Sequence, residues 1–421
     1  MIETISLLPE VTLRACRDPR FKQGCLSFQL VRPMCREEAA LNALLPAVLL
    51  RGTRRCPDLR SITQRLDELY GAAVSPLVRR VGDYQTTGLC CGFMDDRFAL
   101  PGDEVLRPML SFLEELLLDS PLENDSFPAS FVESEKKNLI STIESERNDK
   151  RVYAMSRLLK IMCREDSFGL PRLGEPEQVA AITPENLTNH YRKILYTSPI
   201  EIFYVGSADS TAVAEMLMPL LSRLDRRVQP LAPQTGYYPS EKSDEVETMD
   251  VAQGKLCMGF VTPITNREAD FAAMQVLNTL FGGGMTSKLF LNVREKRSLC
   301  YSIGSAYYSA KGIVIVSAGI DFDQEQATRE EILTQFRACQ AGEITPSELT
   351  AAKEALLSTL RATHDSPGAI ESYYATAALG GLKWSVAEYM TAVEAVTAAD
   401  VTAAARGMEL HTTYFLKGES Q

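Results

Sequence analysis

The chain has 421 residues, 45% of them apolar and 24% charged, and a formal net charge of −11. This length allows two or three domains, each with its own core. The acidic balance argues against a nucleic-acid partner, since such binders carry a basic patch or stripe. No apolar run approaches the ~20 residues that span a bilayer, and the amino terminus lacks the pattern of a secretory signal. We expect a cytoplasmic protein that binds neither nucleic acid nor membrane.

The cysteines argue against metal or redox motifs. Ten are present, and none forms a Cys-x-x-Cys pair, so neither a zinc ribbon nor a thioredoxin-like motif is indicated. Several lie in apolar strand-like runs, where a free cysteine behaves as a small apolar residue. We expect reduced structural thiols.

The first half of the chain reads as mixed strands and helices. Periodicity predicts, in chain order, a strand at 25–31, two helices within 39–72, strands at 74–81 and 84–93, helices at 104–118 and 131–163, a helix after Thr183-Pro184-Glu185, a strand from Ile200 and a helix from Asp209. One residue disturbs this pattern. Pro46 lies inside the first helix, where a proline removes a hydrogen bond and costs about 3 kcal/mol.

A composition shift then separates two halves of similar plan. Residues 226–250 are rich in proline, serine and charge and predict an exposed linker between domains at 1–225 and 251–421. The second half predicts a strand at 255–262, helices at 268–281 and 286–297, a hairpin of strands at 301–308 and 312–320, helices at 323–339, 346–363 and 369–378, and a strand at 412–420. An internal duplication of two α+β halves is the simplest interpretation.

Few residues are suited to catalysis. The three histidines are isolated from one another, and neither H-E-x-x-H nor H-x-x-E-H occurs, so a zinc hydrolase of those designs cannot be built. The informative segment is "FGGGMTSKLFLNVREKRSLCYSIGS", beginning at Phe281. Arg294 near a helix end and Tyr301 at a strand start could together hydrogen-bond a carbonyl oxygen. On spacing alone, a solvated arginine and a packed tyrosine remain the alternative.

This segment resembles the second domain of the insulinase/pitrilysin zinc peptidases, which include mitochondrial processing peptidase. The family's "GGG-M-S-S-R-L-F" and "R-E-K-x-G-L-x-Y-S" motifs correspond to "GGGMTSKLF" and "REKRSLCYS", with Ser298 in place of the glycine. The resemblance implies two homologous domains, each a mainly antiparallel sheet packed with helices, forming half of a clamshell. It also assigns substrate binding to Arg294 and Tyr301, with the glycines Gly282, Gly283 and Gly284.

The same resemblance explains the unusual first helix. In active members it reads "H-F-L-E-H-M-L-F-K-G-T", with two zinc-binding histidines and a glutamate base. Alignment on Arg51-Gly52-Thr53 places Ala43 and Ala47 at the histidine positions and Pro46 at the glutamate position. The third ligand position falls on Ser141 or Thr142. The resemblance therefore implies a chain with no zinc ligands or catalytic base of its own.

Two functions from different classes are consistent with this pattern. In the first, the chain is the non-catalytic subunit of a heterodimeric zinc metallopeptidase. It supplies Arg294 and Tyr301 in trans to a partner that carries H-x-x-E-H and the zinc, and it forms half of the chamber. In the second, it is a stand-alone homodimer that binds peptides or has a structural role, without peptidase activity. An unrelated enzymatic activity in the chamber is a third, lesser alternative.

Overall fold

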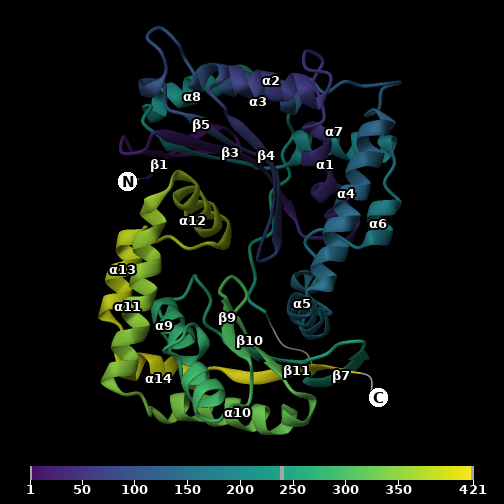
Figure 1. Cartoon of the computed structure of the whole chain (residues 1–421). Coiled ribbons are helices and arrows are strands. Elements are labelled where there is room, and N and C mark those ends of the chain that lie inside the picture. Colours follow the sequence, from purple (N-terminus) through teal and green to yellow (C-terminus); the bar gives the residue numbers. More distant parts are fainter. Residues whose placement is uncertain (1, 238–240, 419–421) are drawn as a thin grey trace. The chain divides into compact units, whose positions relative to one another are not determined.

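The structure is a computed structural model that describes residues 2–237 and 241–418. The chain has an α+β fold with two mixed sheets packed with helices (Figure 1). The described residues form two compact units. Unit 1 comprises the residues up to Glu144, Pro171–Pro233 and His364–Thr376, and unit 2 comprises Ser145–Leu170, Gln234–Thr363 and the residues from Ala377 onward.

Unit 1 contains a six-stranded sheet in the order β1-β2-β6-β3-β5-β4. Its strands are β1 (Ile2–Leu8), β2 (Val11–Arg17), β3 (Gln23–Pro33), β4 (Ala73–Val81), β5 (Tyr84–Met94) and β6 (Ile200–Gly206). Only β2 and β6 pair in parallel, and the other neighbours are antiparallel. The sheet is therefore mainly antiparallel, as the sequence predicts.

Helices cover the apolar face of this sheet. Leu26, Phe28 and Leu30 alternate along β3 and enter one core with the helices, because successive strand residues point to opposite faces. The helices of the first half are α1 (Arg36–Leu49), α2 (Leu59–Glu68), α3 (Leu106–Leu118), α4 (Ala129–Asn148), α5 (Lys150–Met162), α6 (Pro176–Ala180), α7 (Pro184–Thr197) and α8 (Ser210–Ser222).

Unit 2 repeats this design with a five-stranded sheet in the order β7-β11-β8-β10-β9. Its strands are β7 (Ser243–Met249), β8 (Gly254–Val261), β9 (Ser302–Tyr308), β10 (Ile313–Ile320) and β11 (Glu409–Gly418). Its helices are α9 (Phe271–Gly282), the π-helix η3 (Leu289–Lys296), α10 (Glu325–Ala341), α11 (Pro346–Ala362), α13 (Val386–Ala395) and α14 (Ala398–Arg406). Again one pair, β7 with β11, is parallel.

Each unit takes one helix from the other half of the sequence. Most of α12 (Pro367–Gly380) belongs to unit 1, and α5 belongs to unit 2. Each of these helices packs on its sheet (Figure 1). On α5, Leu158 and Met162 lie against Gly259 of β8, which leaves them room because a Cβ there would lie 2.7 Å from the Met162 sulfur. The sequence-based division into residues 1–225 and 251–421 places α5 in the first domain and α12 in the second, so it does not include this exchange of helices.

A buried polar cluster attaches α12 to its sheet. We call Ser27, Gln29, Arg79 and Glu371 the Glu371 cluster. Both Glu371 carboxylate oxygens accept from the Arg79 guanidinium, at 2.9 and 2.7 Å, and one also accepts from the Ser27 hydroxyl at 2.6 Å. The Gln29 amide donates to the same oxygen at 3.2 Å. These bonds replace the water that the Glu371 carboxylate, 1% exposed, has lost.

Several predicted boundaries differ from the structure. The single helix expected at 131–163 is broken at Asp149, whose side chain caps α5 by accepting from the Arg151 and Val152 amides, a role that short polar side chains favour. The predicted linker at 226–250 contains β7. Its residues 238–240, like the end of the strand predicted at 412–420, lie outside the described residues. Strands β1 and β2 and helices α6, α13 and α14 were not predicted.

Across residues 2–237 and 241–418, no helix combines the length and the apolar character needed to cross a membrane.

The Glu371 cluster generates a stability prediction. Glu371→Gln removes the charge that compensates Arg79, whose side chain is 25% exposed. We expect a loss of about 3 kcal/mol, the lower end of the range for breaking a buried ion pair, measured by urea denaturation. The matched control is Glu68→Gln, in the exposed Arg65–Glu68 pair at 3.5 Å, where we expect less than about 0.5 kcal/mol. Equal effects of the two substitutions would contradict this role of the cluster.

Candidate functional site

The degenerate zinc-site positions on α1 lie mostly inside unit 1. Ala43 is 6% exposed, Pro46 is buried and Ala47 is half-buried. The helix runs through Pro46 without a break and ends at Leu49. The apolar side of the helix therefore retains its packing, while the three positions carry two methyl groups and a proline ring.

Pro46 persists because a neighbouring strand supplies the hydrogen bond that it removes. In a regular helix, the amide of residue 46 would donate to the carbonyl of Asn42, four residues earlier. Proline has no amide hydrogen, and the Thr87 hydroxyl of β5 donates to the Asn42 carbonyl instead, at 2.7 Å. A buried carbonyl thus keeps a partner, which avoids a desolvation penalty of about 1–3 kcal/mol.

The Asn42 side chain links α1 to two further polar groups. Its amide nitrogen donates to Gln85 Oε1 at 2.8 Å, and its amide oxygen lies 2.7 Å from His190 Nε2. Gln85 in turn donates to the Ala39 carbonyl at 3.1 Å. Burial lowers the pKa of His190 to about 4, so this imidazole is neutral near pH 7. His190 is therefore a satisfied core residue and holds α7 to α1.

These positions do not fit a zinc ion. Methyl groups at Ala43 and Ala47 offer no lone pair, whereas zinc takes nitrogen, sulfur or carboxylate ligands. Thr142 is exposed on α4, and its hydroxyl donates to the Asn138 carbonyl at 2.9 Å. Throughout the described part of the chain, no group of three or more histidine, cysteine, aspartate or glutamate side chains is placed to hold a metal.

Arg294 and Tyr301 meet in one open pocket of unit 2. This pocket has a volume of about 360 Å³ and is lined by Arg294, Glu295, Ser298, Leu299, Cys300, Tyr301 and Asp321. Arg294 lies near the end of η3, and Tyr301 directly precedes β9. Their side chains are 41% and 60% exposed, respectively. The structure thus brings together the two residues that the sequence singled out.

Both side chains are substantially exposed and contact a few neighbours. The Arg294 guanidinium lies 4.7 Å from the centre of the Phe290 ring, a cation–π contact, and 3.6 Å from Glu295. The Tyr301 hydroxyl donates to both Asp321 carboxylate oxygens, at 3.0 and 3.1 Å. This hydrogen bond raises the pKa of Tyr301 above its usual range, so the phenol remains a hydrogen-bond donor at neutral pH.

The glycine triplet shapes the approach to η3. A Cβ on Gly282 would lie 2.7 Å from Ser305 Oγ, and one on Gly283 would lie 2.7 Å from Thr279 Cα, so both positions require glycine for close packing. A Cβ on Gly284 would meet nothing within 4 Å. Substrate binding by these glycines stays a prediction, since the packing alone accounts for two of them.

Sequence reasoning missed Asp321 and the π-helical form of η3. Asp321 follows β10 directly, and β10 pairs with β9 so that Gly319 faces Ser302. Because Tyr301 immediately precedes Ser302, the predicted hairpin places residue 321 near the phenol, and this register could have identified it. The π-helix has no comparable signal, although such turns occur often at functional sites.

Comparison with known proteins shows full-length similarity. The sequence profile of the "Peptidase M16 inactive domain" matches residues 181–356. The "Probable inactive metalloprotease YmfF" of Bacillus subtilis (strain 168) is 30% identical over 408 residues, which cover 97% of this chain and 96% of that protein.

Solved structures show the same fold over both units. A conserved protein from Enterococcus faecalis V583 superposes with a TM-score of 0.93 at 25% identity and covers 100% of this chain and 99% of its own. A chain of complex III2 from Candida albicans superposes with a TM-score of 0.74 at 14% identity, covering 97% of this chain and 94% of its own.

The bond between Thr87 and α1 can be tested by a double-mutant cycle. Thr87→Val should destabilise unit 1 by about 1–3 kcal/mol, because the buried Asn42 carbonyl loses its donor. In a Pro46→Ala background the restored amide can donate to that carbonyl, so the loss should shrink by at least about 0.5 kcal/mol. Urea denaturation of the four proteins measures this. Thr86→Val is the matched control, because the buried Thr86 hydroxyl has no hydrogen-bond partner among the residues that the structure describes. Equal losses of unfolding free energy from Thr87→Val in both backgrounds would contradict the assigned hydrogen bond.

Ser298 generates a second prediction because its φ is +53°, in the left-handed region. That conformation costs a residue with a Cβ about 1–2 kcal/mol, whereas glycine loses about 0.5–1 kcal/mol in chain entropy. Ser298→Gly should therefore stabilise the protein by about 0.5–1 kcal/mol in urea denaturation. Ser298→Ala, which keeps the Cβ, is the control and should give no gain. A gain of the same size from alanine would show that backbone strain is not the cause.

Proposed function

This chain belongs to the M16 (insulinase) family, as an inactive metalloprotease-like member, and from that premise we propose that it is the non-catalytic subunit of a two-chain zinc peptidase. The partner would be an M16 subunit with an intact H-x-x-E-H motif and its zinc. This chain would contribute Arg294 and Tyr301 to that partner's active site and would supply half of the chamber. The zinc chemistry would belong to the partner alone.

One observation carries the proposal: Arg294 and Tyr301 share an open pocket and are both substantially exposed. Their side chains are 41% and 60% exposed, and the ion pair of Arg294 joins it only to the adjacent Glu295. A structural arginine or tyrosine would be tied more firmly into its surroundings. The same chain has lost the ligand side chains at Ala43 and Ala47, so it retains groups that bind a peptide and lacks those that cleave it.

The two side chains supply complementary hydrogen-bond donors. A guanidinium presents several N–H groups in a planar fork, and a neutral phenol presents one O–H. Directed at the carbonyl oxygen of a scissile peptide bond, they would stabilise the negative charge that develops there during hydrolysis. To do so, the Tyr301 hydroxyl must turn from Asp321 to the carbonyl or share its proton between them, while Asp321 keeps the phenol oriented beforehand.

The sheet edge beside Tyr301 suits an extended peptide. β9 is an edge strand of its sheet and pairs with β10, and Tyr301 lies at its start. A peptide that added to β9 as a further strand would gain main-chain hydrogen bonds with little dependence on sequence. Its backbone carbonyls would then pass close to the Arg294–Tyr301 pocket.

The test begins with the complex as the host makes it. A tagged copy of this chain is recovered from its own host, and stoichiometric companions are identified by mass spectrometry. We expect an M16 subunit with H-x-x-E-H. Cleavage of a quenched fluorescent peptide by that complex should fall about 100-fold with Arg294→Ala and at least about tenfold with Tyr301→Phe, as for other oxyanion-stabilising donors.

Matched controls separate this role from general damage. Arg337→Ala removes an exposed arginine of α10 in the same unit, and Tyr196→Phe alters a tyrosine that is 40% exposed in unit 1. Both should leave cleavage unchanged, and all four variants should still assemble. Recovery of the chain alone as a homodimer that binds peptides would instead support the stand-alone function. Unchanged cleavage by both Arg294→Ala and Tyr301→Phe would remove the role in trans.

A further inference from the structure

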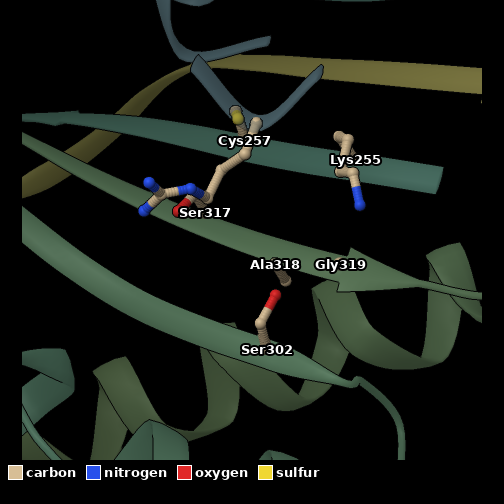
Figure 2. A pocket seen from close by; sticks show the side chains of 7 residues that line it. Lys255, Cys257, Ser302, Ser317, Ala318 and Gly319 are labelled. Atoms are coloured by element: carbon tan, nitrogen blue, oxygen red, sulfur yellow. The ribbon is translucent and has the colours of Figure 1, made fainter. Parts of the chain in front are cut away.

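A second, smaller cavity lies on the sheet of unit 2. It has a volume of about 40 Å³ and is lined by Arg151, Lys255, Cys257, Ser302, Ser317, Ala318 and Gly319 (Figure 2). A single water needs a cavity volume of roughly 10–15 Å³, so this cavity has room for a group of a few heavy atoms. Two cationic side chains and two hydroxyls in one small cavity favour an anionic group.

The strand register explains how these residues meet. Gly319 of β10 faces Lys255 on β8 and Ser302 on β9, and Ser317 faces Cys257. Figure 2 shows Lys255 and Ser302 on the two strands that flank the strand carrying Ser317 and Gly319. A Cβ at Gly319 would lie 2.9 Å from Ser302 Oγ and 3.4 Å from Lys255 Nζ. The same Cβ would lie 3.0 Å from Gln253 Oε1, so glycine keeps open a space bordered by the Lys255 ammonium, its Gln253 acceptor and the Ser302 hydroxyl.

The cationic groups of this cavity are incompletely neutralised. The Lys255 ammonium donates to Gln253 Oε1, a neutral partner that leaves two of its three hydrogens available. Burial lowers the pKa of Lys255, and Asp149 acts against this shift. The Asp149 carboxylate already caps α5. Within the described residues the Arg151 guanidinium forms no ion pair. An additional carboxylate would complete this set of donors.

We propose that this cavity binds a carboxylate of the peptide, either its free C-terminus or an acidic side chain. The peptide nature of the ligand rests on the proposed function, which this inference deepens. Lys255 and Arg151 would supply the charge, and the hydroxyls of Ser302 and Ser317 would donate hydrogen bonds to the same oxygens. Cys257, 1% exposed, would form a neutral wall.

The cavity lies beside the Arg294–Tyr301 pocket along the same strand. Ser302 follows Tyr301 directly, and adjacent strand residues point to opposite faces. A peptide added to β9 also directs alternate side chains to opposite faces. Its carbonyl could then lie at Tyr301 while a carboxylate extends over Ser302 on the other face, toward the cavity above Gly319. The cavity would thereby fix the register of a peptide that main-chain hydrogen bonds alone leave free to slide.

Three small peptides test the site on the isolated full-length chain by saturation-transfer NMR titration. The probes are N-acetyl-Val-Thr-Val with a free C-terminus, the same peptide as its C-terminal amide, and N-acetyl-Val-Glu-Val as its amide. We expect saturable binding of the first, the third or both, and at least about tenfold weaker binding of the second, as for loss of a charge-assisted hydrogen bond. Preference for the first identifies a C-terminus, and preference for the third identifies a side chain.

Variants locate the binding. Lys255→Met should lower the affinity for the two carboxylate probes at least about tenfold. Gly319→Ala should lower it to a similar extent, because the added methyl group fills the cavity. Lys242→Met is the control, because it removes an exposed lysine of unit 2 that pairs with Glu409 at 3.2 Å. Thermal unfolding of each variant checks its folding.

Three outcomes overturn the proposal: equal binding of all three probes, no saturable binding of either carboxylate, or unchanged binding by folded Lys255→Met. Binding of inorganic phosphate in the absence of carboxylate binding also counts against it. Because the assay requires neither a partner subunit nor cleavage, its failure would leave the role of Arg294 and Tyr301 intact. Conversely, loss of that role would leave a measurable carboxylate site.

Discussion

The structure depends on burying the second face of each sheet under a helix from the other half of the chain. A mainly antiparallel sheet can leave one face in water, but here both faces carry helices. In unit 1 the covered face is mixed. Ile370 of α12 packs on the buried Cys16 and Val205, and the Glu371 carboxylate of α12 lies 2.7 Å from Arg79. In unit 2 the equivalent face receives α5 through apolar contacts. Just beyond the end of α5, Asp166 forms an ion pair with the buried Lys311 at 2.8 Å. A buried pair such as Arg79–Glu371 adds little net stability but strongly penalises its own disruption, so it disfavours any packing of unit 1 that separates α12 from its sheet.

On the other face of the unit 1 sheet, core packing explains why α1 is helical although it lacks the residues that would make it catalytic. The helix closes the core of unit 1 through Leu44, Leu45 and Val48, so packing maintains it whatever its former ligand positions carry. Even a proline is accepted, because Thr87 on β5 satisfies the Asn42 carbonyl. The packing of this helix is thus independent of the ligand positions: its apolar side supports the unit, whereas Ala43 and Ala47 offer no lone pair to a zinc ion.

The sequence predicted those features that depend on neighbouring residues. The periodicity of β3, the threonine cap at Thr183 and the hairpin of β9 and β10 are local patterns, and each appears in the structure. Features that depend on distant partners were missed. Strand β7, "SDEVETM", has no apolar alternation because it is an edge strand that pairs only with β11 in the described sheet. The exchange of α5 and α12 has no local signature at all. Nor does the bond from Thr87 to Asn42, since it joins residues 45 positions apart.

In the candidate site, too, the sequence predicted the residues of a local motif and missed their more distant partners. Arg294 and Tyr301 were identified through a sequence motif, and the structure adds the groups that modify them: Phe290 beneath the guanidinium, and Asp321 as the acceptor of the phenol. Asp321 would matter for the proposed function because its hydrogen bonds orient the Tyr301 hydroxyl while no peptide is present. An arginine alone would attract any anion. In the proposed role, the Asp321 carboxylate beside the phenol would repel an anion from this pocket and would leave a neutral carbonyl acceptable. On these two proposals the pocket would take a peptide bond, whereas the cavity at Lys255, whose acidic neighbour Asp149 caps α5, would take a carboxylate.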